Sequence, residues 1–428
     1  MFPALVSPKI ITLIIFILTY CGLIFLPKKR LLYAGVGAGL LIILQIINLP
    51  EIITAIDWNV LLMILGTSGL VIFFSESKMP ALLGEKVIDK APNFRWAVVL
   101  LSILAGGISA FLENVSTLLI VAPIALSMAK KLKTSPVPLL IIIAISSNLQ
   151  GAATLIGDPT SIMLGNYANL NFLQFFFLNH KPGIFFAVEI GAIMAALITF
   201  YLFRKNKQPI HSIEHTKVTD FLPTILLLLM IISLIGVSFI KEKPALTNGF
   251  ICSGFFLLGI LRELTTKHSW SPKKIIKNLN WETLILLSFI FIIIGAVIKV
   301  GLINDIANLI AGAGQNNIFL LYSIIVWGSV LVSAFVDNIP YVATMLPVIN
   351  ALTMQLGVSP YLFYFGLLSG ATLGGNITPV GASTNITALN ILKREGYHVS
   401  FREFIKYSLP FTLAAIISGY LFIWFVWH

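Results

Sequence analysis

The chain has little charge, few acidic residues and almost no cysteine. Of its 428 residues, 11% are charged and 58% are hydrophobic, and the mean hydropathy is +0.97. A soluble globular protein is about 25% charged, so an ordinary soluble enzyme is excluded. Only two cysteines are present, each inside an apolar run. This excludes a disulfide framework and a cysteine-rich metal site.

Long apolar runs are present instead of charged surface. Runs of about 20 apolar residues can cross a bilayer core of about 30 Å, which predicts an all-α polytopic membrane protein. The excess of 28 basic over 17 acidic residues then follows from the bias of Lys and Arg toward cytoplasmic loops, and it does not indicate nucleic-acid binding. Residues 10–26 lack the flanks of a signal peptide, and we interpret them as the first span.

The sequence contains an internal repeat. Ser-Ala-Phe-Leu-Glu-Asn at 109–114 returns as Ser-Ala-Phe-Val-Asp-Asn at 333–338, an offset of 224. At this offset, residues 109–166 share 15 identities in 58 positions with the second copy. The identities include Asn, Pro, Gly and Ser-Pro, which chance agreement between apolar helices would not align. We predict two copies of one unit, residues 1–203 and 221–428, joined by a cytoplasmic linker, 204–220.

Each copy contains three spans, an apolar hairpin, an interrupted span and a last span. The predicted segments are 10–26, 31–48, 58–75, the hairpin 96–129, 136–169 interrupted at 151–161, and 183–203, then 221–240, 246–261, 281–300, the hairpin 318–355, the interrupted span 360–392, and 408–427. Each hairpin limb has about 15 apolar residues, which favours a re-entrant loop over a crossing.

Five crossings per copy give the two copies opposite orientations. This arrangement places 23 of the 28 basic residues on one face, and leaves on the other Lys9, Lys181, Lys241, Lys243 and Lys299. Counting the hairpins as full crossings would blur this segregation. The predicted fold is two inverted-topology repeats, each of five transmembrane helices and one re-entrant hairpin with a broken helix. Both termini are predicted to be extracytoplasmic, in the cell (inner) membrane. This is the architecture of secondary transporters.

Two hairpin tips and two glycine-rich helix breaks are predicted to converge near the midplane. Freed carbonyls and hydroxyls there suit Na⁺, and helix N-termini suit an anion. The candidate substrate- and ion-binding residues are Glu113, Asn114, Ser116 and Thr117 at the first tip; Asn148, Thr154, Gly157, Asp158, Thr160 and Ser161 around the first break; Asp337 and Asn338 at the second tip; and Asn376, Thr378, Gly381, Ser383, Thr384 and Asn385 at the second break. No catalytic residue, cofactor or transition-metal site is predicted.

Glu113 and Asp337 carry most of the functional argument. A carboxylate near the bilayer centre costs about 2.5–3.5 kcal/mol, so we expect it to pair with a cation or take up a proton. The alternative is that these acids and the adjacent asparagines only cap the second limb of each hairpin. Asp158, which precedes Pro159, fits a turn or N-cap position as well as it fits a functional role. Glu189 has no acidic counterpart in the second copy, and we interpret it as an interfacial or helix-packing residue.

These motifs resemble the ion transporter superfamily of arsenite permeases, divalent-anion/Na⁺ symporters, citrate permeases and Na⁺/H⁺ antiporters, above all the branch of the arsenite permeases and the melanosomal P protein. The resemblance covers essentially the whole chain. It rests on Ser-Ala-Phe-Leu-Glu-Asn-Val-Ser-Thr (109–117), Ala-Thr-Leu-Ile-Gly-Asp-Pro (153–159), Gly-Gly-Asn-Ile-Thr-Pro-Val-Gly-Ala-Ser-Thr-Asn (374–385) and residues 394–401. It implies an elevator-type carrier, often dimeric, whose tips and breaks hold substrate and coupling ions.

The tips differ from those of the dicarboxylate symporters, which carry Ser-Asn-Thr at both. Here an acid replaces the serine, and two anionic tips would repel a di- or tricarboxylate unless neutralised. We therefore expect a secondary transporter coupled to H⁺ or Na⁺, homodimeric in the bilayer, moving a small anion, oxyanion or arsenite-like solute. Na⁺/H⁺ antiport is the alternative, and a carboxylate symporter or a channel is less favoured. An intramembrane aspartyl protease is disfavoured because Asp158 has Ala382 as its repeat counterpart.

Overall fold

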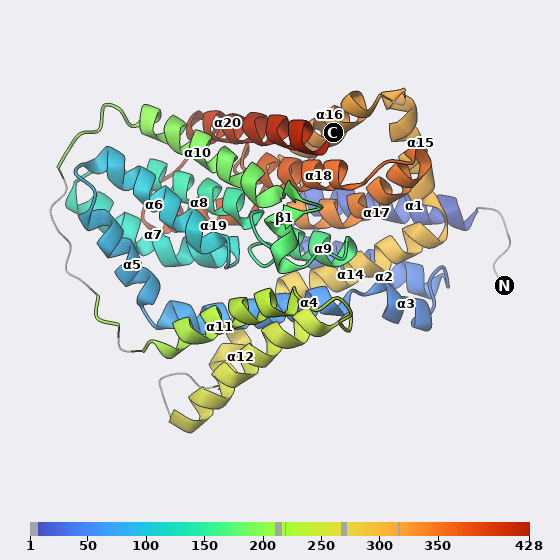
Figure 1. Ribbon diagram of the computed structural model, residues 1–428, viewed down its shortest axis with the longest axis horizontal. Coiled ribbons are helices and arrows are strands. Elements are labelled where there is room, and N and C mark those ends of the chain that lie inside the picture. The colour runs from blue at the N-terminus through green and yellow to red at the C-terminus, as the bar shows by residue number, and fades with distance from the viewer. Residues whose placement is uncertain (1–6, 210–215, 219, 267–271, 316) are drawn as a thin grey trace.

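The structure is a computed structural model that describes residues 7–209, 216–218, 220–266, 272–315 and 317–428. Within these ranges it contains twenty α-helices, two 3-10 helices and one two-stranded antiparallel hairpin (Figure 1). The predicted linker, 204–220, has no helix in its described part. Its residues 210–215 and 219 lie outside the described residues.

The two halves of the chain contain the same succession of ten helices. The first half comprises α1 (Pro8–Phe25), η1 (Pro27–Lys29), α2 (Arg30–Ile43), α3 (Leu49–Ala55), α4 (Trp58–Glu76), α5 (Met79–Asp89), α6 (Phe94–Ser109), α7 (Asn114–Lys131), α8 (Val137–Gly151), α9 (Pro159–Tyr167), η2 (Phe172–Phe175), β1 (Phe177–Leu178), β2 (Lys181–Pro182) and α10 (Ile184–Leu202). In the β-hairpin, Phe177 pairs with Pro182 and Leu178 with Lys181.

Each helix of the second half corresponds to the helix numbered ten lower in the first half. The second half comprises α11 (Leu222–Val237), α12 (Thr247–Thr266), α13 (Pro272–Asn278), α14 (Trp281–Lys299), α15 (Leu302–Gly314), α16 (Ile318–Ser333), α17 (Asn338–Leu356), α18 (Tyr361–Gly374), α19 (Ser383–Arg394) and α20 (Phe401–Trp427).

The helices follow the predicted segments, with two differences. Four short helices, α3, α5, α13 and α15, were not predicted. They are too short or too polar for a search based on span length; α3, for example, has seven residues and begins with a capping box between Asn48 and Glu51. The expected limb of about 15 apolar residues suits α6 and α16, which have 16 residues each. The second difference is α17, which has 19 residues and is by itself long and apolar enough to cross a membrane, so the re-entrant hairpin stays a prediction.

Six helices in the described ranges are long and apolar enough to cross a membrane: α1, α4, α10, α14, α17 and α20. Shorter apolar helices of 10–17 residues accompany them: α2, α6, α8, α11 and α18. Large apolar side chains such as Leu18 and Phe425 point outward, as expected for a protein surrounded by lipid. The chain is therefore a nearly all-helical, multi-pass membrane protein; the ten crossings stay a prediction.

The helices form two packed groups (Figure 1). In the group that we call the frame, α4 packs on α12, α2 on α14, α1 on α2, and α11 on α4 and α12. In the other group, the hairpin body, α6 packs on α8, α16 on α18, and α10 and α18 on α20. The pairing of α2 with α14 corresponds to that of α12 with α4, so the contacts of the frame repeat along with the helices.

Two tips and two breaks lie in the hairpin body. The limbs α6 and α7 are joined by residues 110–113, and α16 and α17 by residues 334–337. We call residues 110–117 the first tip and 334–341 the second. The first break, 151–161, separates α8 from α9, and the second, 374–385, separates α18 from α19. Pro159 at the first position of α9 suits this restart because its missing N–H would have had no helical partner.

The contact between α4 and α12 makes a test of frame packing. A Cβ atom on Gly66 of α4 would lie 2.2 Å from the backbone carbonyl carbon of Cys252 in α12. Backbone atoms, unlike a side chain, cannot rotate away from the added methyl group. Gly66→Ala should therefore push α4 and α12 apart and lower the free energy of unfolding by about 1–3 kcal/mol. The control is Gly254→Ala in α12, where a Cβ would meet nothing within 4 Å and alanine favours the helix. Thermal unfolding in detergent should show a lower midpoint for the Gly66 variant alone; equal midpoints would refute this packing.

Candidate functional site

The first tip and the first break are tied together by side-chain hydrogen bonds. The Thr154 hydroxyl, from the break, donates to the carbonyl oxygen of Ala110 in the tip. The Asn114 side chain donates through Nδ2 to Asp158 Oδ2 and accepts at Oδ1 from the Ser109 hydroxyl at 2.7 Å. Lipid offers no hydrogen-bond partner to a tip inside the membrane. These internal bonds therefore satisfy backbone and side-chain polar groups that would otherwise be costly to bury.

Asp158 is a buried carboxylate that also caps a helix. Its Oδ1 accepts from the backbone N–H of Thr160 at 2.8 Å and from the Thr160 hydroxyl at 2.7 Å. The residue is 3% exposed. Asp158 therefore occupies the N-cap position of α9, as the capping interpretation expects. Capping is not its whole role, because the second oxygen of the carboxylate connects α9 to the tip through Asn114.

Glu113 is not a helix cap. It occupies the N-cap position of α7, but its side chain makes no capping hydrogen bond. Instead it accepts from the Ser116 hydroxyl at 3.0 Å and from Asn280 Nδ2 at 3.1 Å. It borders a cavity of about 10 Å³, a volume that fits about one water-sized particle. The other polar residues lining this cavity are Thr67, Ser68, Asn280 and Thr283.

The second tip and break repeat part of this arrangement. The Thr378 hydroxyl donates to the carbonyl oxygen of Ala334 at 2.5 Å and accepts from the Gly381 N–H at 3.1 Å. Asp337 accepts from the Ser383 hydroxyl at 3.1 Å and from the Ile339 N–H at 3.2 Å. The capping alternative thus accounts for one oxygen of Asp337 and leaves the other free for a different partner.

Glycine is required at equivalent places in the two breaks because carbonyl groups crowd there. A Cβ atom on Gly157 would lie 2.6–2.9 Å from the carbonyl oxygens of Gly151, Ser109 and Ala110, and one on Gly381 would lie 2.7–2.9 Å from those of Ala334, Gly375 and Ser333. Each break therefore gathers three carbonyl oxygens against a tip. Carbonyl oxygens are hard ligands of the kind that small cations prefer.

The two halves of the chain meet at an asparagine cluster. Asn148 of α8 donates to Asn376 Oδ1 at 2.8 Å and to Asn385 Oδ1 at 3.4 Å. Asn376 in turn donates to the carbonyl oxygen of Ile145 at 3.0 Å. The hydroxyls of Thr160 and Thr372 are 3.5 Å apart across the same interface. Each break therefore contacts the helix that precedes the other break, α8 or α18.

The remaining predicted residues lie in the same four segments. Ser161 donates to the Gly151 carbonyl at 3.2 Å, and Asn385 donates to those of Gly375 and Thr378. Three others are buried: Thr117, Asn338 and Thr384. Among the described residues the Thr117 hydroxyl has no hydrogen-bond partner. Their functional roles stay a prediction.

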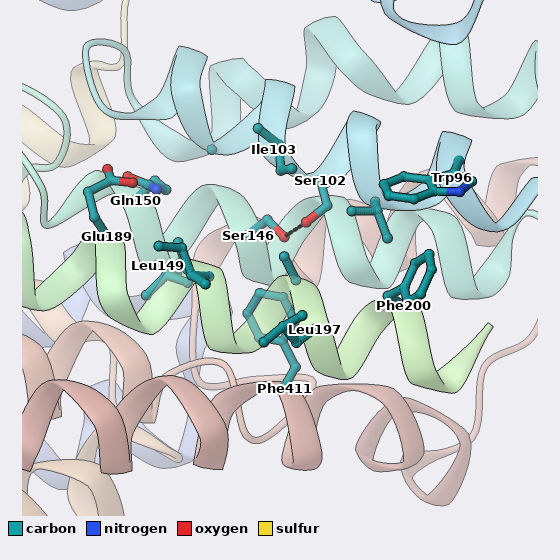
Figure 2. A pocket seen from close by; sticks show the side chains of 15 residues that line it. Trp96, Ser102, Ile103, Ser146, Leu149, Gln150, Glu189, Leu197, Phe200 and Phe411 are labelled. Carbon is teal, nitrogen blue, oxygen red and sulfur yellow. Dashed lines mark hydrogen bonds between the residues drawn. The ribbon is translucent and has the colours of Figure 1, made fainter. Parts of the chain in front are cut away.

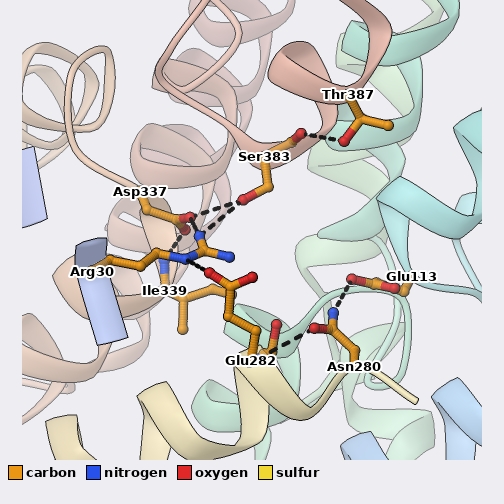
Figure 3. Close-up of polar contacts among 9 residues, drawn as sticks. Arg30, Glu113, Asn280, Glu282, Asp337, Ile339, Ser383 and Thr387 are labelled. Atoms are coloured by element: carbon orange, nitrogen blue, oxygen red, sulfur yellow. Dashed lines mark hydrogen bonds and ion pairs between the residues drawn. The ribbon is translucent and has the colours of Figure 1, made fainter. Parts of the chain in front are cut away.

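Arg30, Asn280 and Glu282 belong to the site but were not predicted. In Figure 3, the Arg30 guanidinium lies between the carboxylates of Asp337 and Glu282, and the Asn280 amide faces Glu113. The sequence placed Arg30 among the basic residues of a cytoplasmic loop. That placement is incomplete: Arg30 is the first residue of α2 and reaches the second tip. No motif marks it, and α12, the helix that corresponds to α2, begins at Thr247 instead of a basic residue.

Glu189 lies in the hairpin body, away from the tips. Figure 2 shows it beside Gln150 at one end of a largely apolar cavity of about 410 Å³ between α6, α8 and α10. Gln150 Oε1 has no partner among the described residues, and Ser102 and Ser146 form a hydrogen bond of 2.7 Å on the cavity wall. The carboxylate borders this cavity instead of being enclosed by neighbouring helices.

Comparison with protein families and curated sequences gives consistent matches. The model of the citrate transporter family CitMHS matches residues 11–368. The "46 kDa membrane protein" of Mycobacterium leprae is 28% identical over 425 residues, covering 97% of this chain and 98% of that protein. An uncharacterized transporter of Synechocystis is 29% identical over 420 residues, with 91% of each covered. The mouse P protein is 27% identical over 487 residues, covering 94% of this chain and 58% of the P protein.

Two solved structures share the fold. The YdaH transporter of Alcanivorax borkumensis superposes with a TM-score of 0.60 at 13% identity, covering 97% of both chains. MtrF of Neisseria gonorrhoeae, described as illuminating a class of antimetabolite efflux pumps, gives a TM-score of 0.59 at 15% identity, covering 98% of this chain and 95% of MtrF. At these identities the likeness shows the fold alone.

The threonines that join each tip to its break provide a second test. Thr378→Val removes the hydroxyl that donates to the Ala334 carbonyl and accepts from the Gly381 N–H. Thr154→Val removes the corresponding hydroxyl at the first break. Leaving such buried groups unpaired costs about 1–3 kcal/mol, so both valine variants should melt at lower temperature than the wild type, while Thr378→Ser should not. The control is Thr54→Val, whose hydroxyl is exposed in α3. A Thr378→Val protein that melts like the Thr54 variant would contradict the role of this bond.

Proposed function

Because this chain belongs to the CitMHS citrate transporter family and is a membrane transporter, not an enzyme, we propose that it is a secondary transporter coupled to Na⁺ or H⁺. It works by an elevator-type movement, as a homodimer in the cell membrane. Its substrate is a small anion, an oxyanion or an arsenite-like solute. The coupling ions and the substrate bind where the tips and breaks meet.

The observation that carries this proposal is the pair of tip-and-break clusters joined through Asn148. Non-helical backbone and ionisable side chains are costly at membrane depth, and they are found there mainly where they bind or conduct something. Both clusters are built alike, with a threonine holding a tip carbonyl and three carbonyl oxygens around a glycine. Sites of this kind at a repeat interface are typical of secondary transporters.

The repeated helix order supports an inverted-repeat topology. If the hairpins are re-entrant, each half crosses the membrane five times, and the second half is inverted. The segregation of basic residues then places α5 and the linker in the cytoplasm, and α3 and α15 outside. In Figure 1, α5 lies at the left end of the molecule and α3 and α15 lie at the right end, as this orientation requires.

The position of the tips supports an elevator-type movement. In this orientation, Arg30 and Asn280 mark the cytoplasmic ends of α2 and α14. Both tips contact these ends, Asp337 through Arg30 and Glu113 through Asn280. A hairpin body displaced toward the cytoplasm relative to the frame, as in an inward-facing state, would account for these contacts.

The charges of the site favour coupling to a cation. Glu113, Asp158 and Asp337 bring three carboxylates to the clusters. In the described residues Arg30 pairs with Asp337, and it also pairs with Glu282. An anionic substrate approaching this set would be repelled until a further cation or proton is bound. Because Arg30 offsets part of the charge at the second tip, the repulsion is smaller than two free tip acids would exert.

Direct Na⁺/H⁺ exchange is the second candidate. Glu113 borders the same small cavity as Gly157 and Pro159, the two residues that flank Asp158. Two neighbouring carboxylates can bind either protons or a metal cation, which is sufficient for exchange without any other substrate. This geometry favours the exchanger over a channel.

Transport in liposomes separates the two candidates. Purified protein is reconstituted with an internal pH-sensitive dye, and an inward Na⁺ gradient is applied with chloride as the only anion. No pH change should follow, and uptake should appear only with arsenite, phosphate, sulfate or a carboxylate. Alkalinisation that depends on Glu113 would instead establish Na⁺/H⁺ exchange. Uptake of every anion without dependence on Na⁺ or pH would refute ion coupling.

The role of Glu113 is tested by Glu113→Gln. Loss of a charged ligand weakens cation binding by about 1.4 kcal/mol or more, so the Na⁺ or H⁺ concentration for half-maximal transport should rise at least about tenfold. Glu51→Gln is the matched control, because Glu51 pairs with Lys299 at the end of α14, far from the tips. Equal ion dependence of the two variants would remove Glu113 from the coupling mechanism.

A further inference from the structure

The second tip already contains a cation that belongs to the chain. Arg30 donates to Asp337 Oδ2 at 3.0 Å and to Ser383 Oγ at 3.3 Å through the same guanidinium nitrogen, and to Glu282 Oε1 at 2.6 Å through Nε (Figure 3). The side chains of Arg30 and Asp337 are each 21% exposed. At this burial their attraction is screened less than that of a surface ion pair.

The first tip has no such cation. Glu113 is the repeat counterpart of Asp337, but its partners are the Ser116 hydroxyl and the Asn280 amide, both neutral. Within the described ranges Glu113 forms no ion pair. Arg30 begins α2, whereas α12, the corresponding helix of the second half, begins at Thr247. The two tips therefore match in backbone and differ in charge.

Cavities at equivalent places beside the two acids differ in the same way. The cavity at Glu113 is lined by four oxygen-bearing side chains from α4 and the N-terminal end of α14, together with apolar residues such as Ile64, Ile156 and Ile162; the oxygen-bearing residues are Thr67, Ser68, Asn280 and Thr283. The cavity at Asp337, of about 40 Å³, is lined by Arg30 and Ser383 together with apolar residues such as Leu23, Leu286 and Phe335. Small cations bind to sets of oxygen ligands. Besides its acid, the first cavity has four oxygen-bearing side chains, whereas the second has Ser383 alone.

We infer that Arg30 is a built-in counter-cation, which takes at the second tip the place that a coupling ion takes at the first. This inference rests on the proposed function, and it assigns the coupling cation to the cavity at Glu113. A guanidinium tethered beside Asp337 competes with dissolved cations at an effective concentration on the order of millimolar or above. Arg30 shares its charge between Asp337 and Glu282, and the second tip thus has a counter-charge beside its acid without binding any ion from solution.

The test measures cation binding without transport. The full-length protein is purified as wild type, Arg30→Gln, Arg30→Lys and the double variant Arg30→Gln/Asp337→Asn. Thermal unfolding in detergent is followed at alkaline pH as Na⁺ replaces choline, and then in choline as the pH is lowered. The titratable and charged groups that face Asp337 are Arg30 from α2, Glu282 from α14 and Asp158 from the first break.

Arg30→Gln should leave Asp337 partly buried and unpaired. In choline at alkaline pH its melting temperature should fall by about 2–4 °C, and Na⁺ or acid should restore it, giving a cation dependence in addition to that of the wild type. Arg30→Lys should resemble the wild type. The double variant should lose the added dependence, because the partly buried carboxylate of Asp337 is gone and Glu282, whose side chain is 52% exposed, is solvated without Arg30.

The results separate this inference from the proposed function. An Arg30→Gln protein with the Na⁺ and pH dependence of the wild type would overturn the inference, as would an added dependence that persists in the double variant. If Arg30→Gln cannot be purified, a stable double variant supports the inference and an unstable one overturns it. A wild type without any cation dependence argues against coupling at Glu113, while the comparison of single and double variants still decides the role of Arg30.

Discussion

The structure depends on the need to satisfy polar backbone groups inside a membrane. A tip or a break leaves helical geometry, and lipid offers no hydrogen-bond partner for the groups set free. The chain solves this by placing each tip against a break, so that Thr154 serves Ala110 and Thr378 serves Ala334. The same contacts bring carbonyl and hydroxyl oxygens together. The groups that stabilise the irregular backbone are therefore also the groups that form the candidate binding site.

Much of this could be predicted because the decisive contacts repeat along the chain. The Thr154–Ala110, Asn114–Asp158 and Thr378–Ala334 contacts each span 44 residues, so one offset between the copies finds both clusters. The short helices α3 and α5 were not predicted because hydropathy over the length of a membrane span does not detect them. Arg30 was not predicted as a site residue for a different reason. Its contact with Asp337 spans 307 residues and depends on how the frame packs against the hairpin body, which no local sequence pattern indicates.

The two halves are alike in backbone but not in charge. Asp158 corresponds to Ala382, and α2 begins at Arg30 whereas the corresponding α12 begins at Thr247, so the first cluster gains an acid and the second gains a cation. The unequal charges give the two tips different electrostatic surroundings, while the shared threonine and glycine positions keep the geometry of both. Hydropathy and repeat analysis emphasise the shared part, and the difference becomes visible only when the halves are packed together.

The Arg30–Asp337 pair also constrains any movement between the two bodies. Arg30 begins α2 in the frame, whereas Asp337 belongs to the hairpin body, so an elevator-type displacement of the body must separate them. Breaking a partly buried ion pair leaves two charges short of a partner, which is costly unless each finds another. Arg30 already has Glu282 within the frame at 2.6 Å, and it can keep this partner when the body moves. Among the described residues, Asp337 would retain its hydrogen bonds from Ser383 and Ile339. If the body moved against the frame, the cost of separating the pair would therefore fall mainly on Asp337.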